Sequence, residues 1–177
     1  MTDMLVRLYD MPEVTPLVQQ LGDRGIVIRI ARACEKHLVV EWVREVFSDG
    51  WASECEVAFS HQPVSCFIAT EAGEILGFAC YDSTCKNFFG PTGVAKIKRR
   101  LGIGKALLLS CLHSMAANGY AYAIVGGTGP AGYYAKTLGA IKIEGSVPGI
   151  YRDKLTPKKA EQSDPGGGYQ KEKPASG

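Results

Sequence analysis

One segment narrows the possible folds more than any other: a β-strand pattern that runs directly into a basic glycine loop and an apolar helix. Residues 87–95 are predicted as a strand, and residues 106–117, rich in Ala and Leu, as a helix. Between them lies Arg99-Arg100-Leu101-Gly102-Ile103-Gly104-Lys105. Glycine lets a ligand approach the backbone, and a helix N-terminus offers free N–H groups and partial positive charge. The segment predicts a phosphate or pyrophosphate site; the alternative is a solvated basic turn that only caps the helix.

The distribution of charge supports an anionic ligand. The chain has 177 residues and a net charge of +2. Residues 1–82 hold 6 Lys/Arg against 13 Asp/Glu, a net of −7, whereas residues 83–143 hold 8 Lys/Arg and no acid. Residues 144–177 add a net of +1. A binding site for a polyanion, kept free of competing carboxylates, would explain the acid-free segment. Buried strands and helices that simply carry few charges would explain it equally well.

The remaining pattern predicts a single α/β domain with a mixed sheet. Strands are expected at residues 3–9, 26–31, 65–70, 75–82, 120–125 and 140–144, with an interruption at Gly90-Pro91 in the strand 87–95. Helices are expected at 15–21, 35–47, 52–60 and in a short segment through Lys136, with Ser48-Asp49-Gly50 ending the helix 35–47. We expect a strand and short helix packed on the domain at 1–23, the domain at 24–155, and a disordered tail at 156–177.

Two other nucleotide motifs do not fit. A Walker A loop needs Ser or Thr after Gly104-Lys105, and Ala106 stands there. A dinucleotide fingerprint matches Gly127-x-Gly129-x-x-Gly132, but too little chain follows it to build a doubly wound sheet.

The cysteines predict reduced thiols and no metal site. None of the six forms a Cys-x-x-Cys pair, and no His pair has zinc-ligand spacing. Most lie in apolar segments, where a free Cys packs as a small hydrophobic residue; redox activity of Cys80 and Cys85 is the alternative.

No apolar run is long enough for a membrane span and no secretory signal is visible, so a cytoplasmic protein without a membrane partner is expected. The basic loop lacks interleaved aromatics, which argues against a nucleic-acid partner.

The loop carries a family resemblance. Arg99-x-x-Gly102-x-Gly104-x-Ala106, preceded by Val94, resembles the acyl-CoA pyrophosphate loop of the GNAT acetyltransferase superfamily. The order of predicted elements agrees over roughly residues 24–152, and the resemblance is greatest to uncharacterised bacterial members. It implies a GNAT-like single-domain fold, with a central mixed, mostly antiparallel twisted sheet flanked by helices.

The resemblance also implies a donor and the residues that hold it. The donor would be acetyl-CoA, with its pantetheine arm paired to a strand backbone and its pyrophosphate held by loop amides, while a basic side chain meets the 3′-phosphate. On this chain the matching residues are Thr92, Gly93, Val94, Ala95, Arg99, Arg100, Leu101, Gly102, Ile103, Gly104, Lys105 and Ala106. The family often has glycine where Arg100 stands, so the loop here is either more extended or uses Arg100 on a phosphate.

The resemblance implies a tyrosine as general acid toward the leaving thiolate. Tyr134 is the best match and Tyr133 the second. The spacing from Tyr134 to Gly139 is one residue longer than in the family, which leaves the choice between the two open, and both could instead only pack under the sheet. Family members often place a basic Glu on the strand before the loop, and residues 83–95 hold no carboxylate. Asp82 and then Glu71 are the nearest candidates for a base, although an ordinary structural role for Asp82 is the stronger expectation.

The acceptor is expected near the early helices. Residues 35–60 carry the acidic and aromatic side chains Glu41, Trp42, Glu45, Trp51 and Glu54, which suit a cationic amine, although a solvated acidic face would look the same. The predicted function is transfer of acetyl from acetyl-CoA to a primary amine, of a small molecule or a peptide, by direct attack in a ternary complex. The alternative is a non-catalytic acyl-CoA-binding sensor or interaction module. A homodimer is possible in either case.

Overall fold

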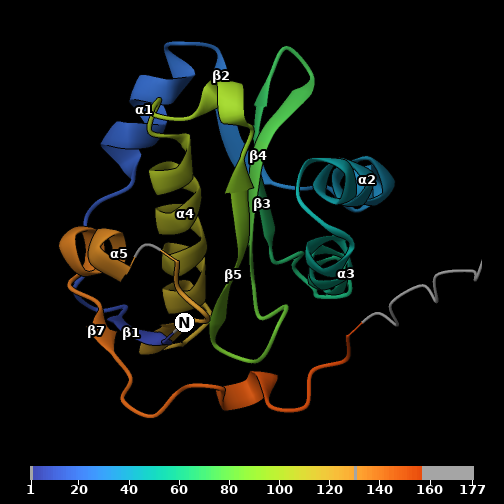
Figure 1. The fold of residues 1–177 in the computed structure, drawn as a ribbon. Helices are drawn as coiled ribbons and strands as arrows, with labels where there is room; N and C mark the ends of the chain where they lie inside the picture. Colours follow the sequence, from blue (N-terminus) through green and yellow to red (C-terminus); the bar gives the residue numbers. More distant parts are fainter. Residues whose placement is uncertain (1, 130, 157–177) are drawn as a thin grey trace, which may run out of the picture.

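The protein is built on one seven-stranded sheet with helices on both faces (Figure 1). The computed structural model describes residues 2–129 and 131–156, so residues 157–177 of the segment predicted as a disordered tail lie outside it. The strands are β1 (Met4–Arg7), β2 (Ile26–Ile30), β3 (Cys66–Glu71), β4 (Glu74–Tyr81), β5 (Phe88–Val94), β6 (Tyr122–Val125) and β7 (Ile141–Lys142). The helices are α1 (Thr15–Gly22), α2 (Lys36–Val46), α3 (Asp49–Ala58), α4 (Ile103–Ala117) and α5 (Ala131–Leu138), with short 3₁₀ turns at η1 (Ala33–Glu35), η2 (Lys96–Lys98) and η3 (Gly149–Tyr151).

The sheet confirms the predicted mixed, mostly antiparallel arrangement. Its order is β2-β3-β4-β5-β6-β1-β7, and the β5–β6 pair is parallel while the other neighbours are antiparallel. The first strand of the chain therefore lies inside the sheet, between β6 and β7. In Figure 1, α1, α4 and α5 cover one face, and α2 and α3 cover the other.

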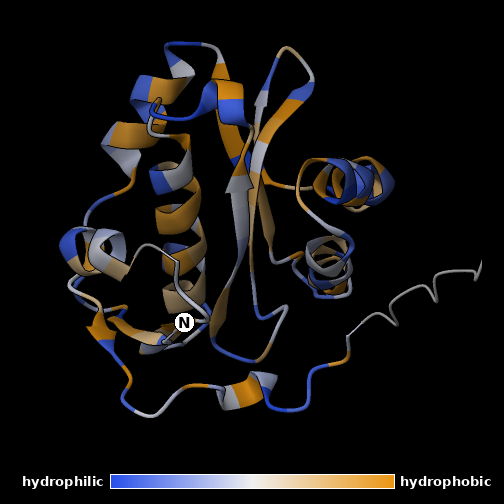
Figure 2. Ribbon diagram, in the orientation of Figure 1, coloured by the Kyte–Doolittle hydropathy of each residue, from blue (hydrophilic) through white to orange (hydrophobic). Residues whose placement is uncertain are grey.

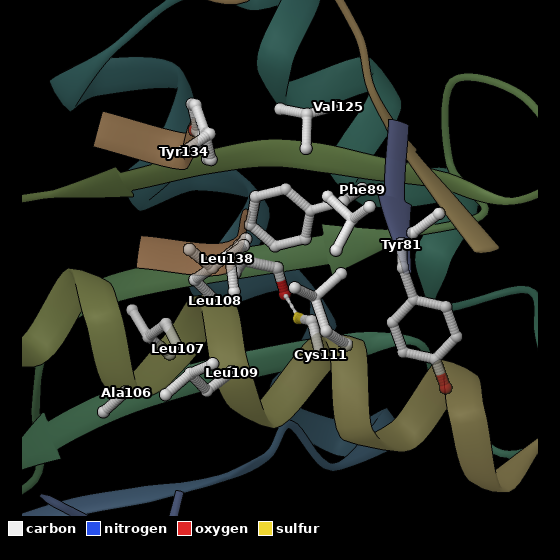
Figure 3. Close-up of a cluster of buried hydrophobic side chains, with 14 of the residues drawn as sticks. Tyr81, Phe89, Ala106, Leu107, Leu108, Leu109, Cys111, Val125, Tyr134 and Leu138 are labelled. Carbon is white, nitrogen blue, oxygen red and sulfur yellow. Dashed lines mark hydrogen bonds between the residues drawn. The ribbon is translucent and has the colours of Figure 1, made fainter. Parts of the chain in front are cut away.

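Helix α4 forms the centre of the larger core. Its apolar residues Leu107, Leu108, Leu109, Leu112 and Met115 are fully buried, and Figure 3 shows several of them against Phe89, Val125 and Leu138. Each buried Leu contributes about 1.5–3 kcal/mol. Figure 2 shows α4 hydrophobic along most of its length, whereas α2 carries many hydrophilic residues. The helix that follows the glycine loop is thus held firmly against the sheet.

Two local predictions are wrong. Helix α2 ends at Val46, before Ser48 as predicted, but α3 begins at Asp49 and not near Ala52, because Ser48 caps it: the Ser48 Oγ accepts the Trp51 N–H at 3.3 Å. Strand β5 is not interrupted at Gly90-Pro91 but continues through it. The register between β4 and β5 shifts there, so that these two residues face one residue of β4, and this bulge accommodates a proline that cannot donate to the ladder.

Candidate functional site

A cleft opens where β5 and β6 diverge. The two strands pair only at Phe88–Ile124 and Phe89–Val125, so the rest of β5 has no strand on that side. Apart from the Val94 carbonyl, which accepts a hydrogen bond from the Arg99 side chain, the backbone groups on this edge have no partner among the described residues and can pair with an extended ligand. The cleft contains a cavity of about 270 Å³, which Thr92, Gly93, Val94 and Arg99 line together with residues of α4 and α5.

The opposite face of β5 is closed by aromatic rings. The Phe47 ring packs so closely that a Cβ at Gly93 would lie 2.3 Å from its Cζ. Phe47 in turn stacks on Trp51, with ring centroids 5.2 Å apart, and contacts Phe78. Gly93 is therefore required by packing against Phe47.

The glycine loop ends at the N-terminus of α4, which points its amides at the cleft. Gly102 is the N-cap residue with φ 91°, a conformation that favours glycine. Within the described chain, Ala106 is the first residue of this stretch whose N–H reaches a backbone acceptor, the Gly102 carbonyl at 3.0 Å. The amides of Leu101 to Lys105 are left to a ligand or to water. Arg100 and Ile103 line the cleft, with Gly104 between them and Val94.

Arg100 takes the place of a glycine in backbone conformation too. Its φ of 69° lies in the left-handed region, so the loop follows a glycine-like path instead of being more extended. For a non-glycine residue this conformation costs roughly 1–2 kcal/mol. The exposed Arg100 side chain lines the cavity, where it can meet an anion.

The other basic side chains of the loop differ in whether they pair with a carboxylate. Arg99 is exposed, lines the cavity, and donates from Nε to the Val94 carbonyl at 3.2 Å. Lys98 is ion-paired with Glu71 and is thus partly neutralised, which also removes Glu71 as a free base. Lys105 is exposed, Ala106 is buried in the core, and Ala95 lines a neighbouring hollow with Phe47 and Trp51.

Tyr134 lies where two cavities meet. A second cavity of about 920 Å³ shares Phe89, Thr92 and Tyr134 with the cleft. Tyr134 is 9% exposed, and no hydrogen bond of its hydroxyl is found among the described residues. Burial raises the pKa of Tyr134, and the neighbouring Tyr133 raises it further, so the hydroxyl keeps its proton at neutral pH. Tyr133 lines only the first cavity and is 40% exposed.

The second cavity holds part of the predicted acceptor set. Trp51 and Glu54 of α3 line it, whereas Glu41, Trp42 and Glu45 do not. Glu41 and Glu45 are exposed on α2, and Trp42 packs edge-on against Phe47 and Phe78. A helix turns its residues to different sides, so only the α3 pair faces β5.

The structure adds residues that the sequence analysis missed. Tyr151 and Lys154, from the segment after β7, close the second cavity opposite α3, and Lys154 lies over the Tyr151 ring at 5.5 Å. The loop from Gly126 to Gly129 lines it as well, and the buried Asp3 anchors this loop by accepting the Gly127 N–H at 2.8 Å. Gly127 and Gly129, two glycines of the dinucleotide fingerprint that the sequence analysis rejected, thus line the second cavity. No local sequence pattern marks Tyr151 or Lys154, because they reach the second cavity only through the path of the chain after β7.

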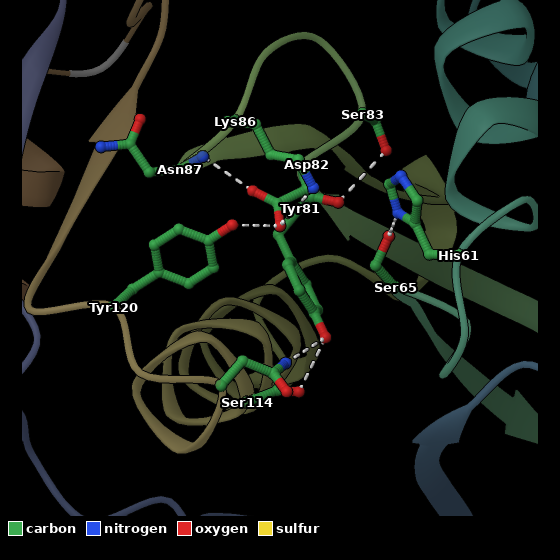
Figure 4. A network of polar contacts seen from close by, with 10 residues as sticks. His61, Ser65, Tyr81, Asp82, Ser83, Lys86, Asn87, Ser114 and Tyr120 are labelled. Carbon is green, nitrogen blue, oxygen red and sulfur yellow. Dashed lines mark hydrogen bonds and ion pairs between the residues drawn. The ribbon is translucent and has the colours of Figure 1, made fainter.

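Asp82 lies outside both cavities, in a structural network (Figure 4). Its carboxylate accepts the Asn87 N–H at 2.7 Å and the Tyr120 hydroxyl at 2.8 Å, and Lys86 lies 3.8 Å away. Burial and this hydrogen bond raise the pKa of Tyr120 to about 12. Asp82 closes the turn between β4 and β5, and we assign it no role as a base.

Comparisons with known proteins agree with this geometry. A fungal multi-domain β-N-acetylglucosaminidase with a GCN5-related glucosamine N-acetyltransferase region has a similar fold, with a TM-score of 0.65 and 13% identity over 80% of this chain and 19% of that one. A GCN5-related N-acetyltransferase from Sphaerobacter thermophilus has a TM-score of 0.57 and 19% identity over 80% of this chain and 48% of that one. One from Kribbella flavida has a TM-score of 0.51 and 13% identity over 80% of this chain and 53% of that one. At these identities the likeness concerns the fold alone, and the chain spans about half or less of their lengths. No curated protein sequence matches it.

The sequence itself matches a family profile. The acetyltransferase (GNAT) family matches residues 36–140, which include α2, α3, the glycine loop, α4 and α5. This is more than half of the chain, and it contains the cleft between β5 and β6. The chain therefore belongs to the GNAT acetyltransferase family.

Proposed function

We propose that the protein is an N-acetyltransferase that moves an acetyl group from acetyl-CoA to a primary amine in a ternary complex. GNAT acetyltransferases are acyl-CoA-dependent transferases, and the acetyl donor and amine acceptor are inferred for this chain. The observation that carries the proposal is the junction of two cavities at Tyr134, one bounded by free amides and the other by a carboxylate. Holding two reactants at such a junction lowers the entropic barrier to their reaction.

The residues of the cleft fit acetyl-CoA. The unpaired edge of β5 offers backbone groups to a pantetheine arm, and the free amides of Leu101 to Lys105 offer donors to a pyrophosphate. Gly102 and Gly104 leave room for this approach, while Arg99 and Arg100 supply positive charge. When bound, acetyl-CoA would supply an acetyl group already activated as a thioester.

The chain's own groups divide the remaining work. Tyr134 holds a proton on its hydroxyl, next to both cavities, and would donate it to the departing thiolate. Glu54 and Trp51 would bind and orient the cationic acceptor in the second cavity. Phe47 and Trp51 pack against β5 and exclude water from that side.

A thiol-release assay tests the proposal directly. The full chain is incubated with acetyl-CoA and a panel of small-molecule and peptide amines, and free thiol and acetylated amine are measured together. We expect release of both in equal amounts with at least one amine. Thiol release without an acetylated product would mean hydrolysis and would contradict the proposal.

A non-catalytic acyl-CoA sensor is the second candidate. It is favoured by the strand β5, which carries no carboxylate, and by the full engagement of Asp82. It predicts that CoA raises the melting temperature while no amine in the panel is acetylated. Chemistry with any amine would rule it out.

A further inference from the structure

Three cysteines far apart in the sequence meet on the other side of the sheet from α4. Cys55 lies on α3, Cys66 on β3 and Cys80 on β4, and their sulfur atoms all lie within 4.8 Å of one another. All three side chains are completely buried. The three thiols thus converge on one point, and the acetyl transfer proposed above uses none of them.

A β-bulge creates this meeting. Near the hairpin turn, Glu71 faces Glu74 and Thr70 faces Ile75, and continuing that register would place Cys66 opposite Ala79. The register shifts by one residue between Ala69 and Thr70, and Cys66 then faces Cys80. The adjacent pair is joined by the hydrogen bond from the Tyr81 N–H to the Ser65 carbonyl, so Cys66 and Cys80 form a non-hydrogen-bonded pair, in which side chains lie closest.

We propose that Cys55, Cys66 and Cys80 form a binding site for a trivalent thiophilic ion of the arsenite class, held by three sulfur atoms. A sulfur–ion bond length of about 2.3 Å corresponds to sulfur–sulfur separations of about 4.0 Å in a planar three-coordinate site. The separations are shorter in a pyramidal site. Because the observed sulfur separations are at most 4.8 Å, they would shorten by up to about 0.8 Å to reach the planar geometry, and by more to reach the pyramidal one.

Charge selects the class of ion. The thiols are enclosed by apolar side chains, among them Val39, Val43, Ile68 and Phe78. A net charge would be strongly disfavoured in such surroundings. Three thiolates on a trivalent ion give a neutral complex, whereas a monovalent or divalent ion would leave a net negative charge.

The binding step is balanced and needs no oxidant. Arsenious acid carries three hydroxyl groups, and each is displaced by one cysteine sulfur. Three arsenic–sulfur bonds form, three arsenic–oxygen bonds break, and the three thiol protons leave with the hydroxyls as water.

Binding would connect the cluster to the proposed acceptor side. Cys55 is the neighbour of Glu54 on α3, and β3 and β4 form the hairpin on which α3 packs. An ion bound to all three sulfurs would tie this helix to the sheet. We therefore expect arsenite to stabilise the folded chain, since a ligand that binds only the folded state raises its stability.

The test uses the full chain under a phosphine reductant, with Cys34→Ser and Cys85→Ser to remove the two thiols that are not buried. Arsenite is titrated with long equilibration, and binding is followed by native mass spectrometry and by the melting temperature. We expect one arsenic per chain, a mass change of one arsenic less three hydrogens, and a higher melting temperature. No binding, or a mass change that retains hydroxyl groups, would overturn the proposal.

Variants locate the site. Cys55→Ala, Cys66→Ala and Cys80→Ala should each weaken arsenite binding at least about tenfold, because each removes one intramolecular ligation step. Cys111→Ala is the matched control, since Cys111 is equally buried but lies outside the cluster, and binding should stay within about twofold. Equal losses in control and cluster variants would overturn the site.

A measurement on the parent protein keeps the test decisive if a variant fails to fold. X-ray absorption at the arsenic edge counts the neighbours of the bound ion. Three sulfur neighbours and no oxygen are expected. One or two sulfurs, with oxygen completing the set, would overturn the three-thiol site, whatever the outcome of the thiol-release assay.

Discussion

The proposed donor side and the proposed acceptor side of the site are built in opposite ways. The donor side, from β5 through the glycine loop to α4, is nearly one continuous segment, completed by Tyr133 and Tyr134. The acceptor side is assembled from α3, the turn after β4, the loop after β6 and the segment after β7. A local motif can specify the first, since strand, loop and helix follow one another directly. The second exists only when distant segments have come together.

The largest expected effect falls on Tyr134, which belongs to both sides. Tyr134→Phe removes the proton donor but keeps the buried ring, so we expect turnover to fall about a hundredfold with little change in the KM for acetyl-CoA. Tyr133→Phe is the matched control and should change turnover only a few-fold. Equal effects of the two substitutions on steady-state turnover would contradict the assignment of the acid. Because the pKa of Tyr134 is raised, the parent's rate should stay flat on the basic side to at least the ordinary tyrosine pKa.

Two glycine substitutions separate ligand approach from backbone strain on the donor side. Gly102→Ala and Gly104→Ala should each weaken CoA binding about tenfold, because each adds a Cβ beside the free amides. Gly102→Ala should also lower the free energy of unfolding by roughly 1–2 kcal/mol, since φ there is positive. Gly104→Ala should keep or raise stability, because its Cβ would only touch Val94 at 3.6 Å.

Calorimetry with CoA and urea unfolding measure these two effects independently. Unchanged CoA binding by the folded Gly104→Ala variant would mean that the ligand backbone does not approach α4 closely.

The acceptor side is tested by a carboxylate on α3. Glu54→Gln keeps the shape but removes the charge, so the KM for the amine should rise about tenfold, as for a lost charge-assisted hydrogen bond. The KM for acetyl-CoA should not change. Glu45→Gln on α2 is the control, since Glu45 is exposed and lines neither cavity. If the control raised the amine KM as much as Glu54→Gln, the acceptor would lie on the outer face of α2.

The smallest expected effect concerns the glycine-like residue of the loop. Arg100→Gly should raise the free energy of unfolding by about 1 kcal/mol, because the left-handed conformation then carries no Cβ penalty. Arg100→Ala keeps that penalty and removes only the guanidinium. If CoA binding weakens in both variants, the Arg100 side chain contacts the ligand. If CoA binding weakens only in Arg100→Ala, a contact between this side chain and the ligand is contradicted.

Much of the donor side is predictable because its signals are short-range. The strand 87–95, the loop and the helix that follows were found at nearly their observed bounds, since each depends on residues within a few positions. The hairpin and the mixed sheet were predicted for the same reason. The errors are local as well: Ser48 caps α3 and starts it about three residues earlier than predicted, and a bulge carries β5 through Pro91.

The amino-acid sequence alone predicts the basic glycine loop, the apolar helix behind it and the charge that suits an anion. The folded structure is needed to show that Glu54 lines the second cavity, that Asp82 is engaged in a turn, that Tyr151 closes the second cavity, and that Cys55, Cys66 and Cys80 meet. Helix and loop geometry is fixed by neighbouring residues, whereas which side of a helix faces β5, and which cysteines face each other after a one-residue bulge, depends on packing between distant segments.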